Sequence, residues 1–213
     1  MTTVLFVRHG ESQANRRNLF IGHTDMDLEE NGIKQAEATA RFIAETYKVD
    51  KVYASDLIRA ARTGQIIADA FGLTVKTDAR FREIYAGEWE GESFFDLYEK
   101  YKEDFTLWNQ DLGNSRCTGG ESVRALGDRI LKAATALAQE NEGKTIVSAT
   151  HATPIRAMES LVKTGDVLKM QAFSWVSNAS VSVFTYENGR WSAEAISLDA
   201  HLGEMRTALP EKI

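Results

Sequence analysis

The chain has 213 residues, of which 43% are hydrophobic and 26% are charged. This length predicts a single domain, residues 1–213, with room for one insertion. Lys and Arg number 25 and Asp and Glu number 31, which gives a net charge of −6. This acidic balance argues against nucleic acid as a main partner, since binding a polyanion requires an excess of positive charge. The first apolar run ends at Arg8 and is too short for a membrane span or a signal peptide. The one cysteine cannot form an internal disulfide, so a cytoplasmic protein is expected.

Short apolar runs rich in β-branched residues alternate with longer amphipathic stretches, which predicts an α/β domain. Residues 3–7 show no polar alternation and are expected to form a strand that is buried on both faces. Gly72 and Ser122 suit the end of one helix and the start of another, and Asn188-Gly189 favours a hairpin turn. The expected helices span residues 29–47, 57–71 and 123–140, and the other strands span 52–54, 145–150, 181–186 and 191–196.

Residues 89–121 depart from this alternation and are predicted to form a helical lid inserted over the domain. This segment, which we name the aromatic segment, holds seven of the 20 aromatic residues of the chain. Five of them recur at spacings of 4, 3, 4 and 3, which places them on one helix face: Phe94, Tyr98, Tyr101, Phe105 and Trp108. Such a stripe is more typical of packing than of a ligand site, and both interpretations stay open. Eight acidic and three basic residues give the segment a local charge of −5.

Two of the four histidines, His9 and His151, each directly follow a predicted buried strand. Because the carboxyl ends of parallel strands meet at one edge of a sheet, we expect the two side chains to lie close together. Arg8 precedes the first of them, and Gly10 follows it and permits close backbone approach. Basic groups without a metal-binding motif favour an anion site. Arg8 would also repel a cation, so neither a metal nor a cofactor is expected.

Cys117 is the one candidate for thiol chemistry. The loop Arg of a thiol phosphatase would fall at position 123, which is Val123 here, and Arg124 comes one position too late. An inert thiol is therefore expected.

Four motifs in chain order carry a resemblance to a known family. They are RHGESQAN at 8–15, SDLIRAART at 55–63, REIYAGEWEG at 82–91 and THATPIR at 150–156. Together they resemble the signatures of the histidine phosphatase (phosphoglycerate mutase-like) superfamily, and residues 178–181 and 199–202 resemble its last strand and tail. The match runs over nearly the whole chain. It implies a three-layer α/β/α sandwich with a mostly parallel central sheet.

The resemblance also implies a metal-independent phosphoryl transfer. His9 would be the nucleophile that takes the phosphoryl group on a ring nitrogen. Glu83 would act first as general acid and then as general base. The groups that would surround the phosphoryl oxygens are Arg8, Asn15, Arg59 and His151. Ile21, Gly22 and Ala152 are expected to contact the substrate.

Several of these assignments depend on the motifs alone. Spacing does not distinguish Glu83 from Glu88 or Glu90, nor Arg59 from Arg62, and the motif alignment chooses Glu83 and Arg59. His23 and His201 are expected to be structural or surface residues. The family often has Gly-Gly after the second histidine, where this chain has Ala152-Thr153. The backbone N–H of Ala152 still suits an anion, while Thr153 is expected to narrow the entrance.

Hydrolysis is favoured over a mutase reaction. Cofactor-dependent mutases carry Arg and Tyr where this chain has Ile84 and Ala86. The acidic aromatic segment would also repel a bisphosphate, unless Lys100, Lys102 and Arg116 meet at the mouth of the site. The expected substrate is a small phosphomonoester with a weakly charged or apolar leaving group, such as a sugar, nucleoside-type or aryl phosphate.

Three other functions stay open, a cofactor-dependent phosphoglycerate mutase, a non-catalytic module that binds a phospho-ligand, and a protein phosphatase. The last would need a shallow, open site, which the insertion disfavours. The complete set of catalytic residues disfavours the second. The expected partner is a small molecule rather than nucleic acid or a membrane, and a homodimer stays open.

Overall fold

The computed structural model describes residues 1–207. Within them a six-stranded sheet has the order β3-β2-β4-β1-β5-β6. Neighbouring strands pair in parallel from β3 through β1, and β5 and β6 add an antiparallel edge. The predicted mostly parallel sheet is thus confirmed. The strands are β1 (Thr2–Arg8), β2 (Lys51–Ala54), β3 (Val75–Thr77), β4 (Thr145–Thr150), β5 (Val181–Glu187) and β6 (Arg190–Leu198).

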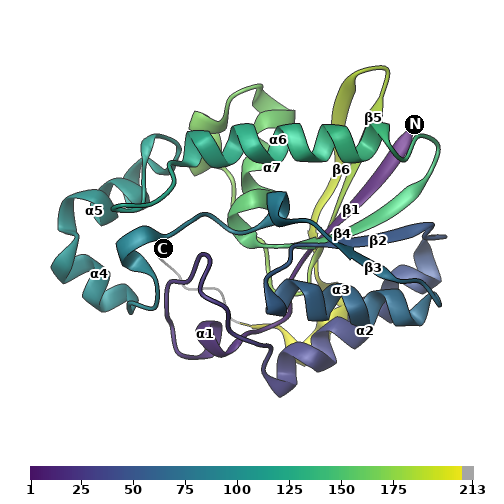
Figure 1. Ribbon diagram of the computed structural model, residues 1–213, viewed down its shortest axis with the longest axis horizontal. Coiled ribbons are helices and arrows are strands. Elements are labelled where there is room, and N and C mark those ends of the chain that lie inside the picture. The colour runs from purple at the N-terminus through teal and green to yellow at the C-terminus, as the bar shows by residue number, and fades with distance from the viewer. Residues whose placement is uncertain (208–213) are drawn as a thin grey trace.

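Helices cover both faces of the sheet, which confirms the three-layer sandwich. One face carries α6 (Val123–Gln139) and α7 (Ala152–Thr164), and the other carries α2 (Glu30–Thr46) and α3 (Ile58–Ala70) (Figure 1). Alternate side chains of β1 enter the two cores. Val4 and Phe6 pack in the cluster with α6 and α7, whereas Leu5 and Val7 pack in the cluster with α2 and α3. This double burial explains the unbroken apolar run of β1.

The predicted helix and hairpin boundaries agree with the structure to within a few residues. Ser122 caps α6 by accepting a hydrogen bond from the Ala125 backbone N–H. Gly72 follows α3 with a φ of +63°, and Asn188 and Gly189 form the β5–β6 turn with φ values of +50° and +79°. Two positive φ angles in a two-residue hairpin turn are the geometry that Asn-Gly favours.

Three elements were not predicted in the sequence analysis. They are α1 (Gln13–Arg16), β3 and α7. The first two are very short. The first nine residues of α7, Ala152 through Ser160, are all buried, and they include the polar residues Arg156, Glu159 and Ser160.

The aromatic segment forms two helices, α4 (Phe94–Lys100) and α5 (Lys102–Gln110), on the side of the molecule away from β2 and β3 (Figure 1). The backbone breaks at Tyr101, which has φ −125° and ψ 41°. The prediction of a single aromatic helix face was therefore wrong. Phe105 and Trp108 are buried, but Tyr98 is 49% exposed.

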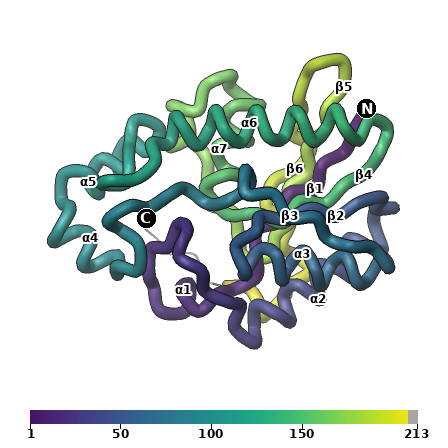
Figure 2. The backbone as a smooth tube through the Cα atoms, viewed as in Figure 1, coloured from purple at the N-terminus to yellow at the C-terminus, as the bar shows by residue number. Residues whose placement is uncertain are grey.

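The loop that follows β1 lies beside the start of α4, and the smooth trace shows the two segments together (Figure 2). Leu19 and Ser93 form an isolated antiparallel bridge. The Phe20 backbone N–H donates to the Glu92 carbonyl oxygen over 2.8 Å. These contacts bring the aromatic segment to the edge of the sheet where β1 ends. None of the helices in residues 1–207 combines the length and apolar character that crossing a membrane requires.

Candidate active site

His9 and His151 meet at the carboxyl ends of two adjacent parallel strands. Arg8 in β1 is in register with Thr150 in β4, and the His9 backbone N–H donates to the Thr150 carbonyl oxygen over 2.9 Å. The two imidazole rings lie 5.2 Å apart between centroids, with an interplanar angle of 62°. Both side chains are buried. The strand order therefore brings together two residues that are far apart in the sequence.

The His9 ring is oriented by its own loop. Nδ1 lies 2.7 Å from the Gly10 carbonyl oxygen. A carbonyl oxygen only accepts, so the proton is on Nδ1 and the lone pair of Nε2 is free. Burial, followed by the positive charges of Arg59 and Arg8, lowers the pKa of His9 well below its ordinary value. The ring is therefore neutral at neutral pH, which is the form that acts as a nucleophile.

Two arginines place buried positive charge beside these rings. Arg8 donates through Nη1 to the Val176 carbonyl oxygen over 2.6 Å. Arg59 donates through Nη1 and Nη2 to the carbonyl oxygens of Thr24 and Gly22, over 3.0 and 2.7 Å. Burial lowers the pKa of each guanidinium to about 10, so both stay charged at neutral pH. Backbone carbonyls hold the two side chains without neutralising them.

Several polar atoms of this cluster have no partner in the described part of the chain. They are Nε of Arg8, Nε of Arg59 and both ring nitrogens of His151. Buried polar groups are normally hydrogen-bonded, because leaving one unpaired costs about 1–3 kcal/mol. Burial, followed by Arg59, also lowers the pKa of His151. The acceptor oxygens of a multiply charged anion suit the two arginine Nε–H groups and the one N–H of the neutral His151 ring.

Glu83 is the buried acid that faces this cluster. Its Oε1 accepts from the Ile84 backbone N–H over 2.8 Å. Its Oε2 accepts from the Thr153 backbone N–H over 3.3 Å at the start of α7. Burial raises the pKa of Glu83 above its ordinary value despite these hydrogen bonds. A carboxyl group that keeps its proton to a higher pH suits a general acid.

Arg129, in α6, holds the backbone that carries Glu83, and the sequence analysis did not identify it. Its Nη1 donates to the carbonyl oxygens of Arg80 and Arg82, over 2.8 and 3.0 Å, and its Nη2 donates to that of Glu83 over 3.2 Å. Glu121 pairs with the same guanidinium over 2.8 Å. In the sequence Arg129 is simply one polar residue of an amphipathic helix, so its role has no local signal.

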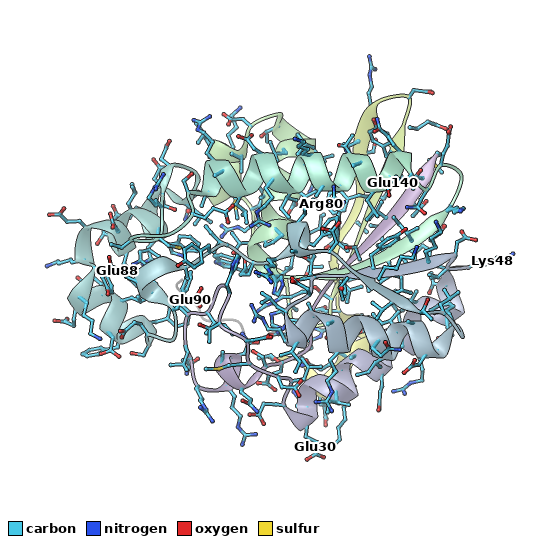
Figure 3. The ribbon with its side chains drawn as sticks, in the orientation of Figure 1. Glu30, Lys48, Arg80, Glu88, Glu90 and Glu140 are labelled. Atoms are coloured by element: carbon cyan, nitrogen blue, oxygen red, sulfur yellow. The ribbon has the colours of Figure 1, made fainter. Side chains whose placement is uncertain are left out.

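The competing acids Glu88 and Glu90 both lie on the side of the molecule that carries α4 and α5 (Figure 3). Glu88 is exposed and lines no part of the pocket. Glu90 is a structural anchor rather than a free acid. Its carboxylate accepts hydrogen bonds from four backbone N–H groups, those of Gly22, His23, Thr24 and Ala86. These bonds outweigh burial and lower its pKa. They join the loop that holds Arg59 to the segment that carries Glu83.

The Asn15 side chain is positioned by the short helix α1 that follows the histidine motif. Its Oδ1 accepts from the Ser12 backbone N–H and from Asn178 Nδ2, both over 3.1 Å. The oxygen is thus engaged, which leaves the amide NH₂ as the group to face an anion. Asn178, which was not predicted as a site residue, also donates to the His9 carbonyl oxygen over 3.1 Å.

One pocket joins most of these residues. It is lined by seven of the predicted site residues, Arg8, His9, Asn15, Ile21, Arg59, Glu83 and Ala152. Of the other two, His151 contacts the His9 ring, and Gly22 supplies a carbonyl to Arg59. Thr153, which was expected to narrow the entrance, lines the pocket, as do Phe94 and Trp108 of the aromatic segment. The lining residues that the sequence analysis did not single out are Ser12, Asn18, Leu19, Phe20, Trp175, Asn178 and Thr207.

The remaining sequence candidates lie outside this pocket. Burial raises the pKa of the Cys117 thiol strongly, so the thiol is protonated and unreactive at neutral pH. His201 stacks on Phe42 at 4.6 Å, which agrees with a structural role. His23 lies closer to the site, since its Nε2 is 3.0 Å from the Glu83 carbonyl oxygen. Within residues 1–207, no three His, Cys, Asp or Glu side chains are grouped to hold a metal ion.

Comparison with known proteins places this chain in a family. Residues 4–199 match the model of the histidine phosphatase superfamily (branch 1). The chain is 33% identical over 204 residues to phosphoserine phosphatase 1 of Hydrogenobacter thermophilus, covering 96% of each chain. It is 30% identical to phosphoglycerate mutase-like protein 4 of Arabidopsis thaliana, covering 94% of this chain and 87% of that protein.

A solved structure agrees with these sequence matches. Phosphoserine phosphatase from Entamoeba histolytica, in complex with phosphoserine, superposes with a TM-score of 0.83 at 26% identity, covering 95% of this chain and all of that one. The chain belongs to the histidine phosphatase superfamily. The names of its relatives support a hydrolase that acts on phosphorylated small molecules.

Proposed function

We propose that this protein is a phosphomonoesterase that hydrolyses a small phosphorylated metabolite through a phosphohistidine on His9. The observation that carries the proposal is the buried basic cluster at the ends of β1 and β4. Two charged guanidiniums, two neutral imidazoles and four unpartnered nitrogens converge there. Arg8, Arg59, His151 and the Asn15 amide would surround the three phosphoryl oxygens and stabilise the charge of the transition state.

In the first step, the lone pair of His9 Nε2 attacks phosphorus while the bond from phosphorus to the ester oxygen breaks. The protonated Glu83 carboxyl gives its proton to that oxygen, so the leaving group departs as an alcohol. The products are a phosphohistidine, an ionised Glu83 and the free alcohol. The Nδ1–H bond to the Gly10 carbonyl keeps the ring in the reactive tautomer throughout.

In the second step, water attacks the phosphohistidine and the bond from phosphorus to Nε2 breaks. Glu83, now ionised, takes the proton of the attacking water and is restored to its acid form. Inorganic phosphate leaves, and His9 returns to the neutral ring. Splitting one displacement into two in this way lowers each barrier. The positive charges that the mechanism requires come from this chain's own arginines.

The surroundings of Glu83 favour hydrolysis over a mutase reaction. Ile84 and Ala86, which replace the Arg and Tyr of cofactor-dependent mutases, are completely buried. Neither side chain can bind a second phosphate or a carboxylate. We further infer that residues 1–213 act as one domain in which the aromatic segment forms the lid of the pocket.

The test is hydrolysis of p-nitrophenyl phosphate in EDTA at about pH 6.5 by the wild type and by His9→Ala. His201→Ala is the matched control, because that histidine lies outside the pocket. We expect activity in EDTA for the wild type and the control, and a loss of at least about 10³-fold for His9→Ala. Radiolabel from a phosphate ester should be trapped on the wild type and on His201→Ala, but not on His9→Ala. Equal activity of the wild type and His9→Ala would contradict the proposal.

A further inference from the structure

The pocket has two chemically different ends. The basic end is lined by Arg8, His9 and Arg59, and His151 lies against the His9 ring. Another part of the lining is formed by four aromatic residues from four separate places in the sequence. This aromatic wall consists of Phe20, Phe94, Trp108 and Trp175. A phosphoryl group bound at the basic end would direct the rest of its ester toward this wall.

Mutual ring contacts hold the aromatic wall in place. Phe20 makes edge-to-face contacts with Phe94 and Trp108, at centroid distances of 6.0 and 5.2 Å. Trp108 stacks on Trp175 at 6.3 Å with an interplanar angle of 23°. Such pairs add about 0.5–1.5 kcal/mol each beyond the area that they bury. The wall is therefore ordered before any ligand binds.

Arg156, in α7, supports the outer member of the wall. Its guanidinium lies 4.3 Å from the centroid of the Trp175 ring, and its Nε donates to the Phe173 carbonyl oxygen over 2.7 Å. Arg156 is buried and does not line the pocket. Its charge therefore stabilises the indole instead of reaching a bound ligand.

In residues 1–207, no basic side chain from the aromatic segment reaches the pocket. Lys100 pairs with Glu92 over 2.7 Å. Lys102 lies 5.9 Å from the Tyr98 ring centroid. Arg116 is engaged with a backbone carbonyl in its own loop. The three cations that would have counted against an uncharged leaving group are therefore occupied elsewhere.

We propose that the aromatic wall is the leaving-group subsite, and that it selects phosphomonoesters of uncharged apolar or aromatic alcohols over those that carry a carboxylate. Ring faces are electron-rich and repel an anion, whereas they pack well against another apolar group. A carboxylate placed there would lose its hydration and gain no cation in return. The inference deepens the proposed function and rests on it. It predicts a leaving-group preference that differs from the substrate for which the phosphoserine phosphatase relatives are named.

The test compares esters of primary alcohols, so that leaving-group reactivity is similar throughout. The substrates are 2-phenylethyl phosphate, phosphoethanolamine and phosphoserine, and the readout is kcat/KM from released phosphate. We expect kcat/KM for 2-phenylethyl phosphate to exceed that for phosphoserine by at least about tenfold. This factor corresponds to the free energy gained by burying part of one aromatic group. A higher or equal kcat/KM for phosphoserine would overturn the inference.

A pair of neighbouring phenylalanines supplies the matched variants. Phe94 lines the pocket, whereas Phe95 is 75% exposed on the same helix. We expect Phe94→Ala to lower kcat/KM for 2-phenylethyl phosphate about tenfold, since much of one ring contact is lost. Its activity on phosphoserine should change little, and Phe95→Ala should leave both substrates unchanged. A loss of equal size on both substrates in Phe94→Ala would overturn the inference.

Lys212→Ala is measured alongside, because Lys212 is the one basic residue of the sequence outside the described residues. A fall in phosphoserine hydrolysis in this variant alone would show that a cation serves the leaving group, and would overturn the inference. The failure of the proposed function looks different. In that case no ester is hydrolysed, or hydrolysis survives His9→Ala, whatever the preference among leaving groups.

Discussion

The basic end and the aromatic wall of the pocket are built by different forces. Arg8, His9 and Arg59 are each held by hydrogen bonds to backbone carbonyls at the edge of the sheet. Phe20 and Trp108 are held by contacts between ring faces and edges, on segments outside the sheet. Hydrogen bonds are strongly directional, whereas apolar packing tolerates small shifts. Changes at the basic end should therefore affect turnover of every substrate, and changes in the wall should affect the choice among substrates.

The largest expected effect in this comparison comes from Glu83→Gln. The amide keeps the size of the side chain but has no proton to give, so hydrolysis of an alkyl phosphate should fall by ~10²–10⁴-fold. The loss should be smaller for p-nitrophenyl phosphate, whose leaving group needs little protonation. Glu88→Gln, an exposed acid near the same site, should match the wild type. A Glu83→Gln variant with full activity on alkyl esters would remove Glu83 from the mechanism.

Glu83 should also shape the pH profile. Because burial raises its pKa, the acid form persists above the ordinary range of a carboxyl group. Formation of the phosphohistidine should then fall as pH rises through this elevated pKa and Glu83 ionises. The rate of the first step can be measured by rapid quench for the wild type and for Glu83→Gln. The decrease in this rate at higher pH should be present in the wild type and absent in the variant.

Arg59→Lys should be the next largest effect, about 10²-fold on kcat/KM for all esters. A lysine ammonium cannot donate to two carbonyls and to a phosphoryl group with the same planar geometry. Arg62→Lys is the matched control, since Arg62 pairs at the surface with Asp27 over 2.6 Å. Surface pairs of this kind contribute little. If Arg59→Lys lowered kcat/KM for one substrate only, the expectation that the basic end affects turnover of every substrate would be contradicted.

Arg129→Ala should give a smaller loss, about tenfold in kcat, because the backbone that carries Glu83 loses three of its hydrogen bonds. As a positioning residue, it should change kcat more than KM and alter the pH profile that depends on Glu83. Arg124→Ala, an exposed arginine on the same helix, should leave both unchanged. An Arg129→Ala variant that melts earlier but keeps its kcat would indicate a purely structural role.

Much of the scaffold could be predicted from local sequence patterns. The runs that became β1 and β4 are apolar because both faces of the sheet are covered, and that requirement shows in consecutive residues. The positions of His9 and His151 immediately after these strands were enough to predict that their side chains meet. Arg59 and Glu83 needed the family motifs, since helical spacing alone left Arg62, Glu88 and Glu90 as alternatives.

Other features were decided only by the tertiary structure, because they depend on contacts between segments far apart in the chain. Arg129 reaches the Glu83 carbonyl across 46 positions, and Asn178 reaches the His9 carbonyl across 169. The aromatic wall joins residues 20, 94, 108 and 175, while the regular spacing within residues 94–108 predicted one helix face that does not exist. Periodicity reports which face of a single element is buried. It carries no information on which distant side chain lies opposite, and that pairing determines the shape and chemistry of the pocket.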